Sequence, residues 1–110
     1  MKFIENEHTE LLGNAMGAYS LRQRMTTTNI ANMDNPDYNR VSVNFEDELR
    51  RAEGRGLENV SPEVVEHEEN PLMEDEMMEM ADTQIRTQLV TRSLRHNFQM
   101  LRSSITGRSQ

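Results

Sequence analysis

A long helical pattern ends in residues 29–38, which read NIANMDNPDY and force the chain to turn. Asn competes for backbone hydrogen bonds inside helices, so Asn29 and Asn32 suit a last helical turn. Pro36 bars continuation of the helix and pushes Asn35 into an extended conformation. A positive φ would strain Asp37, so we expect a type I turn with Pro36 at its second position and Asp37 at its third.

Amphipathic patterns with the spacing of an α-helix lie on both sides of this turn. The first pattern covers residues 9–33, with a 4-3 stripe of Leu12, Met16, Tyr19, Thr26, Ile30 and Met33. The second covers residues 71–106, where Asn70 can cap and Pro71 takes the tolerated first position. Its heptad-like seam contains Met77, Met80, Leu94, Phe98, Leu101 and Ile105, and the neighbouring stripe contains Met78, Ala81, Ile85 and Leu89.

These lengths predict an elongated all-α protein rather than a ball. At 1.5 Å per residue the two helices would measure about 37 and 50 Å, whereas a compact domain of this size has a radius of gyration of about 13 Å. We therefore expect a single elongated domain over residues 1–110, with the terminal helices packed as a coiled-coil hairpin. Their stripes are wider than a two-helix seam needs, which favours completion by assembly.

The middle segment, residues 34–70, is predicted to be an elbow and loop. Residues 40–45 alternate in polarity as a short extended segment, and a short helix over residues 45–53 would place Phe45, Leu49 and Ala52 on one face. Residues 57–70 combine low hydrophobicity with high charge, which is typical of a solvated or flexible segment.

Charge is divided unevenly along the chain. Residues 41–82 carry fourteen acidic and three basic side chains, whereas residues 83–110 carry no acids and five arginines. These arginines are widely spaced and are not interleaved with aromatic residues, so nucleic-acid binding is not expected. Acids at the start of the second helix and arginines toward its end both complement the helix dipole.

Neither a catalytic constellation nor a cofactor or metal site is expected. The chain has no Cys, and residues 66–69 (Glu-His-Glu-Glu) lack the ligand spacing of known metal sites. The serines have no nucleophile-elbow context, and His8, His67 and His96 have no evident orienting partner. No stretch approaches the about 20 apolar residues of a membrane span, and residues 1–8 lack the apolar core of a secretory signal.

The residue 29–38 run resembles the Asn-Ile-Ala-Asn and Thr-Pro-Gly-Tyr signature that ends the N-terminal helix of flagellar rod and hook proteins, with Asn35 and Asp37 at the Thr and Gly positions. Residues 40–52 are similar to the segment that follows this turn in the FlgB-type basal-body rod proteins. Residues 70–77, 80–88 and 101–107 resemble that family's C-terminal helix. Thr87 replaces the usual Tyr of a Tyr-Gln pair, and Asn44 replaces an Asp.

This resemblance implies a structural subunit of the proximal rod that assembles helically and transmits torque from the motor to the hook and filament. The implied partners are further copies of the chain, other rod proteins, a FliE-type adaptor and the flagellar export apparatus. The implied location is the basal-body rod, which spans the periplasm, reached by type III export without a cleaved signal peptide. No nucleic acid, membrane insertion or enzymatic activity is implied.

Two groups of residues would carry this role. The elbow would be set by Asn29, Ile30, Ala31, Asn32, Pro36 and Tyr38. The assembly seam, within and between subunits, would consist of Leu12, Met16, Tyr19, Ile30, Ile85, Leu89, Leu94, Phe98, Leu101 and Ile105. Three alternatives stay open. The first is another rod protein of the FlgC type, and the second is a small acidic helical chaperone or adaptor of a secretion system, which a stable dimer in solution would favour. The third is an enzyme or metal protein built around the His67 region.

Overall fold

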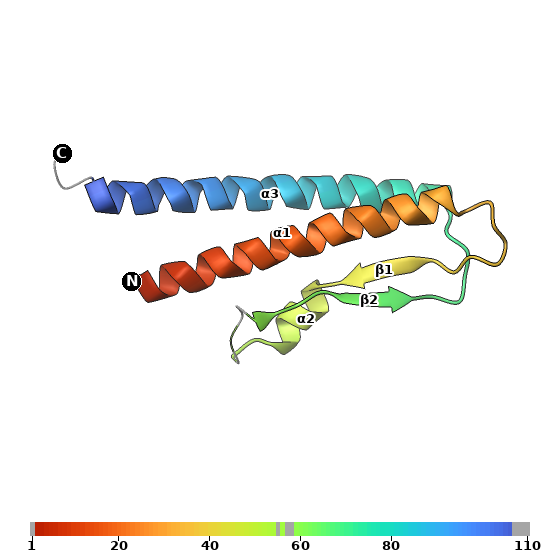
Figure 1. Ribbon diagram of the computed structural model, residues 1–110, viewed down its shortest axis with the longest axis horizontal. Helices are drawn as coiled ribbons and strands as arrows, with labels where there is room; N and C mark the ends of the chain where they lie inside the picture. The colour runs from red at the N-terminus through yellow and green to blue at the C-terminus, as the bar shows by residue number, and fades with distance from the viewer. Residues whose placement is uncertain (1, 55, 57–58, 107–110) are drawn as a thin grey trace.

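Two long helices and a small sheet make up the protein in the computed structural model, which describes residues 2–54, 56 and 59–106. The elements are, in order, α1 (Lys2–Ala31), β1 (Val41–Asn44), α2 (Glu46–Arg51), β2 (Glu63–Glu66) and α3 (Met73–Thr106). α1 and α3 run antiparallel, and α1 lies between α3 and the two strands (Figure 1). The predicted pair of long terminal helices is confirmed.

The molecule is a flat rod, with principal extents of 63 × 28 × 14 Å and a radius of gyration of 17.5 Å. A compact domain of similar length would have a radius of gyration of about 13 Å. The two helices, of 30 and 34 residues, set the long dimension because each residue adds about 1.5 Å. The expectation of an elongated domain is therefore met.

The all-α prediction is wrong in one respect, because β1 and β2 form a two-stranded antiparallel sheet. Val41 pairs with Glu66, and Asn44 pairs with Glu63. The segment expected to be flexible thus contains an ordered strand, although residues 57 and 58 lie outside the described part. β1 supplies the backbone partners that this acidic strand needs, and composition alone does not reveal such a partner.

The apolar core lies where α1 meets the middle segment. Phe45 is 1% exposed and meets Tyr19 edge-on, with ring centroids 6.0 Å apart and planes at 76°. The cluster also contains Ala15, Ala18 and Val60, with Leu49, Ala52 and Val90 packed against it. A short helix is present, but α2 covers Glu46–Arg51 rather than residues 45–53, so Phe45 and Ala52 flank it. These two residues and Leu49 nevertheless all contribute to the core, as predicted. Gly54, whose φ is 84°, follows three residues after the end of the helix.

Both long helices begin at residues other than those expected. α1 already starts at Lys2 rather than residue 9, and α3 starts at Met73 rather than residue 71. Leu72 provides the carbonyl that accepts the Glu76 amide hydrogen bond at 3.0 Å. Asn70 does not take the N-cap position of α3, because the helix starts three residues later, at Met73. Its side-chain amide nitrogen instead contacts three carbonyl oxygens of the elbow, those of residues 35, 36 and 38, at 2.7–3.2 Å.

The elbow has the predicted turn. The Tyr38 amide donates to the Asn35 carbonyl at 3.0 Å, which closes a four-residue turn around Pro36 and Asp37. The Asn35 side chain also accepts from the Asp37 amide at 3.0 Å. Positive φ occurs only at glycines among the described residues, so Asp37 is not in a type II turn.

Candidate functional site

Asn29 is the centre of the elbow. Its side chain is 1% exposed, and its amide nitrogen donates to the Val41 carbonyl and to Glu76 Oε1, each at 2.8 Å. Its oxygen accepts from the Val41 amide at 3.0 Å and from Tyr38 Oη at 3.1 Å. Because two donated and two accepted bonds fully use an Asn side chain, this residue ties α1 to β1, α3 and the turn at once.

Glu76 brings a buried negative charge to the same place. Its side chain is 0% exposed, and Oε2 lies 2.7 Å from Arg40 Nε while Oε1 accepts from Asn29. A buried carboxylate is costly unless it is paired and hydrogen-bonded, and here both oxygens have partners. The start of α3 is therefore held against Arg40, the residue before β1, and the buried Glu76 carboxylate would be unfavourable without this partner.

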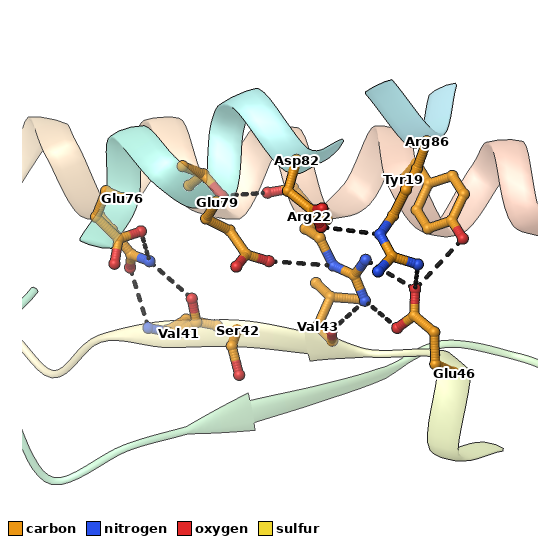
Figure 2. A network of polar contacts seen from close by, with 12 residues as sticks. Tyr19, Arg22, Val41, Ser42, Val43, Glu46, Glu76, Glu79, Asp82 and Arg86 are labelled. Atoms are coloured by element: carbon orange, nitrogen blue, oxygen red, sulfur yellow. Dashed lines mark hydrogen bonds and ion pairs between the residues drawn. The ribbon is translucent and has the colours of Figure 1, made fainter. Parts of the chain in front are cut away.

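Glu46, at the start of α2, collects polar side chains from both long helices (Figure 2). Its carboxylate pairs with Arg22 Nη2 at 2.7 Å and Arg86 Nη1 at 3.3 Å, and accepts from Tyr19 Oη at 3.3 Å. Burial raises the pKa of Glu46, but the hydrogen bond from Arg22, a backbone hydrogen bond and the charges of Arg22 and Arg86 outweigh it and lower the pKa to about 2. The carboxylate is ionised at neutral pH.

Arg22 is the cation on which this network depends. Its guanidinium donates to the Val43 carbonyl at 2.8 Å, lies 3.5 Å from Glu79 Oε1 and sits 5.4 Å above the Tyr19 ring centroid. Burial lowers the pKa of Arg22, but the hydrogen bond and charge of Glu46 more than offset it and raise the pKa. The planar fork of Arg suits this simultaneous contact with a carboxylate, a carbonyl and an aromatic face.

Near the elbow, the two helices therefore meet along a largely polar line, although the predicted seam was apolar throughout. Glu76 and Thr83 are the α3 residues that are buried, and Val90 packs against the core one heptad further on. Thr83 Oγ1 is buried without a hydrogen-bond partner among the described residues. On α1 the buried positions opposite include Arg22, Thr26 and Asn29.

The predicted seam residues are divided by the structure. Tyr19 is buried, and partial burial applies to Leu12, Met16, Ile30, Leu94 and Leu101. Four others are exposed: Ile85 by 58%, Leu89 by 56%, Phe98 by 59% and Ile105 by 67%. These four therefore do not contribute to packing within the chain, and the assignment of the whole set to a seam between subunits stays a prediction.

The elbow residues also differ in what they contact. Asn29 and Tyr38 join the buried network, whereas the Asn32 amide donates only to the Thr28 carbonyl of its own helix at 2.8 Å. Pro36 shapes the turn, Ile30 is half-buried and Ala31 is exposed. The two asparagines of the motif therefore have unequal structural roles, which their shared residue type does not reveal.

Sequence reasoning missed Glu76, Arg22, Arg40, Glu46 and Asn70 as members of the network. A signal was present in part, because Arg22, Thr26 and Asn29 continue the helical spacing of Ala15 and Tyr19. That spacing indicates that the buried face of α1 becomes polar toward the elbow. Their partners on other elements had no comparable signal, since no local pattern relates residue 22 to residue 46.

Contrary to the expectation from the sequence, His67 has a side-chain partner. Ser42 Oγ lies 2.7 Å from His67 Nε2 across the sheet, and no described His, Cys, Asp and Glu side chains gather in a group of three that could hold a metal ion. A groove of about 830 Å³ runs between α1 and α3, lined mainly by uncharged side chains that include Met16, Gln84 and Thr87. The described polar contacts thus join the two long helices and the sheet, while several large apolar side chains remain exposed.

No known family model matches the chain, and no curated protein matches its sequence. Within the described part of the chain, no helix has an apolar stretch of the length that crossing a bilayer requires.

Proposed function

We propose that this protein is a structural subunit of the bacterial flagellar proximal rod, of the FlgB type, that assembles helically and transmits torque. The observation that carries the proposal is the elbow. The Asn-Ile-Ala-Asn run, whose resemblance to the axial proteins is the most specific in the chain, ends α1, and its first Asn is 1% exposed at the junction of α1, β1 and α3.

The stiffness of the subunit supports a mechanical role. α1 and α3 are uninterrupted over 30 and 34 residues and are cross-linked by the Asn29, Glu76 and Glu46 contacts. A load applied along the long axis would be carried by continuous helices whose relative position is fixed by directional polar bonds. This is what a drive shaft requires of its subunits.

The exposed side chains of α3 support assembly with further copies. Ile85, Leu89, Phe98 and Ile105 are each more than half exposed and lie on a single helix. Exposed apolar side chains gathered on one element are typical of protein interfaces. In the proposed rod they contact neighbouring subunits, other rod proteins or the FliE-type adaptor, after passage through the export apparatus.

Electron microscopy of purified basal bodies that carry a tagged copy of this chain tests the proposal directly. The label is expected at the proximal rod, and its absence from the basal body would refute the function. Phe98→Asp places a charge at an exposed position, so the subunit is expected to fold and to be exported while rod assembly and motility fail. Phe98→Leu is the matched control, and normal swimming of the Asp variant would refute the assignment of Phe98 to the interface.

A further inference from the structure

The two-stranded sheet is covered along one edge and open along the other. The outer edge of β1 lies against α1, because both backbone groups of Val41 bind the Asn29 side chain and the Val43 carbonyl accepts from Arg22. β2 lies on the side of β1 that faces away from α1 (Figure 1). We call the outer edge of β2, residues 63–66, the open edge.

The pairing register shows which backbone groups the open edge presents. In an antiparallel ladder, successive residues direct their N–H and C=O groups alternately toward the partner strand and away from it. Val41 directs both groups away from β2 and pairs with Glu66, so the backbone groups of Glu66 point away from β1. The same holds for Val64, which pairs with Val43. The open edge thus offers two donors and two acceptors that have no backbone partner among the described residues.

Side chains along the open edge have the order acidic, apolar, apolar, acidic. Glu63, Val64 and Glu66 are exposed, Val64 by 52%, and Val65 is half-buried. The Glu66 carboxylate accepts one hydrogen bond, from the Asn39 side chain at 3.0 Å. The strand therefore combines free backbone groups with an accessible apolar side chain and two accessible carboxylates.

The arginines beside the sheet are paired with other carboxylates. Arg40 binds Glu76 at 2.7 Å, and Arg51 binds Glu48 at 3.2 Å. Within the described part of the chain, neither glutamate of the open edge has an ion-pair partner. Their charges can therefore select the strand that pairs with this edge.

Charge argues against a second copy of β2 as that strand. Antiparallel pairing of two copies about their centres would place Glu63 of one copy opposite Glu66 of the other, at both ends of the contact. Like charges that lie directly opposite each other destabilise a sheet, whereas opposite charges stabilise it. The edge is thus suited to a strand that carries cations at these two positions.

We propose that the open edge binds an extended segment of a partner protein with the order basic, apolar, apolar, basic. The segment adds antiparallel to β2 as a third strand, with its cations opposite Glu63 and Glu66 and its backbone bonded to Val64 and Glu66. In strand addition of this kind, main-chain hydrogen bonds give affinity and the side chains give specificity. The inference goes beyond the proposed function, because the open edge is separate from the exposed apolar side chains of α3 and its binding does not require a rod.

Synthetic peptides test the contact on the full-length chain, by fluorescence anisotropy at low salt. The probe is a dye-labelled peptide, Thr-Lys-Val-Val-Lys-Thr, with blocked ends. N-methylation of its first lysine and second valine removes the two amide hydrogens that face β2 and should weaken binding about tenfold or more. N-methylation of its first valine and second lysine, whose amides point away, should leave binding unchanged. The peptide Thr-Glu-Val-Val-Glu-Thr, which has the charge pattern of β2 itself, should not bind.

Variants of the chain give the reciprocal test. Val64→Pro removes an N–H group that points outward and no hydrogen bond of the ladder, so the hairpin should persist while probe binding falls about tenfold. Glu63→Lys with Glu66→Lys should weaken probe binding about tenfold and confer binding of the acidic peptide. The matched control is Glu7→Lys with Glu10→Lys, which makes the same charge change at exposed positions of α1 and should bind the probe as wild type does.

Hydrogen exchange locates the bound probe. The amides of Val64 and Glu66 should become protected when the probe is added, whereas the Val65 amide, which is already in the ladder, should change little. No binding to wild type, equal effects of the two methylation patterns, or a control as impaired as the charge-reversed variant would each overturn the proposal. Protection of the same two amides that rises with protein concentration without the probe would assign the edge to a second copy and would also overturn it.

The methylated peptides decide the question on wild type even if circular dichroism shows that Val64→Pro does not fold. Rod labelling in basal bodies is independent of all these measurements, so failure of the open-edge contact is distinguishable from failure of the proposed function.

Discussion

Substitution of Asn29 by Asp tests whether the elbow depends on the buried network. The change keeps the shape of the side chain but replaces the amide group that donates to the Val41 carbonyl and to Glu76 Oε1, each at 2.8 Å. Two buried acceptors then lose their donor, at about 1–3 kcal/mol each. The introduced carboxylate also lies beside the fully buried Glu76 carboxylate, so we expect a total loss of about 3–5 kcal/mol.

Asn32→Asp is the matched control, because it introduces the same charge one turn further along the same helix end. The Asn32 amide has one bond, to the Thr28 carbonyl at 2.8 Å, and the side chain is only half-buried. Loss of this hydrogen bond and the unfavourable negative charge at the helix C-terminus should together lower the free energy of unfolding by about 1 kcal/mol. Urea unfolding followed by circular dichroism at neutral pH measures the free energy of unfolding of each variant relative to wild type. Equal destabilisation by Asn29→Asp and Asn32→Asp would refute the account of Asn29 as the centre of the elbow.

Three further predictions concern stability. The pKa of Glu46 is about 2 in the folded chain and 4.5 without its partners, so its contribution is present above pH 4.5 and is lost as the pH falls toward 2. With 34% of that side chain exposed, solvent screening limits the loss to about 1–2 kcal/mol, to be measured by unfolding of wild type against Glu46→Gln. Thr83→Val removes a buried hydroxyl without a partner among the described residues and should raise stability by about 1 kcal/mol, read from the melting temperature. Phe45→Ala should cost about 3–5 kcal/mol, whereas Val64→Ala, at a position 52% exposed, should cost far less in the same melts.

The terminal helices and the turn were predictable because their causes are local. Apolar residues at helical spacing, uninterrupted by Pro, require only neighbours along the same chain segment. The turn follows in the same way from the fixed φ of Pro36 and from the strain that a positive φ would impose on Asp37. The structure agrees at both places, with a hydrogen bond from the Tyr38 amide to the Asn35 carbonyl.

The second strand was not predictable from its composition. Glu63–Glu66 has the acidic character of a solvated segment, and three of its four residues are exposed. Its order comes from pairing with Val41–Asn44, about twenty residues away, and from Val60, which is buried in the core just before it. Sheet pairing depends on a partner that a local window does not contain.

The predicted seam shows that helical periodicity does not identify the partner of an apolar stripe. Helical spacing correctly indicates that Ile85, Leu89 and Phe98 lie on apolar stripes, but it does not indicate what those stripes contact. In the chain, polar residues at the same spacing, such as Glu76 and Thr83, occupy the line between the helices instead. An ion pair or a shared Asn side chain can hold two helices together. A pattern based on hydrophobicity alone, however, predicts that such polar positions face outward.

Polar side chains thus join the two helices, while large apolar side chains are exposed, and this arrangement has a mechanical consequence. Polar contacts such as those of Asn29 and Glu46 require defined distances and angles, so they permit one relative position of α1 and α3. Apolar contacts are non-directional, and the exposed Phe98 and Ile105 can therefore accommodate neighbours in slightly different orientations. In the proposed rod, a subunit built in this way would stay rigid while its interfaces adjust. Changes in the polar network should consequently alter the melting temperature of the free subunit, whereas changes at the exposed apolar positions should alter assembly and leave that melting temperature unchanged.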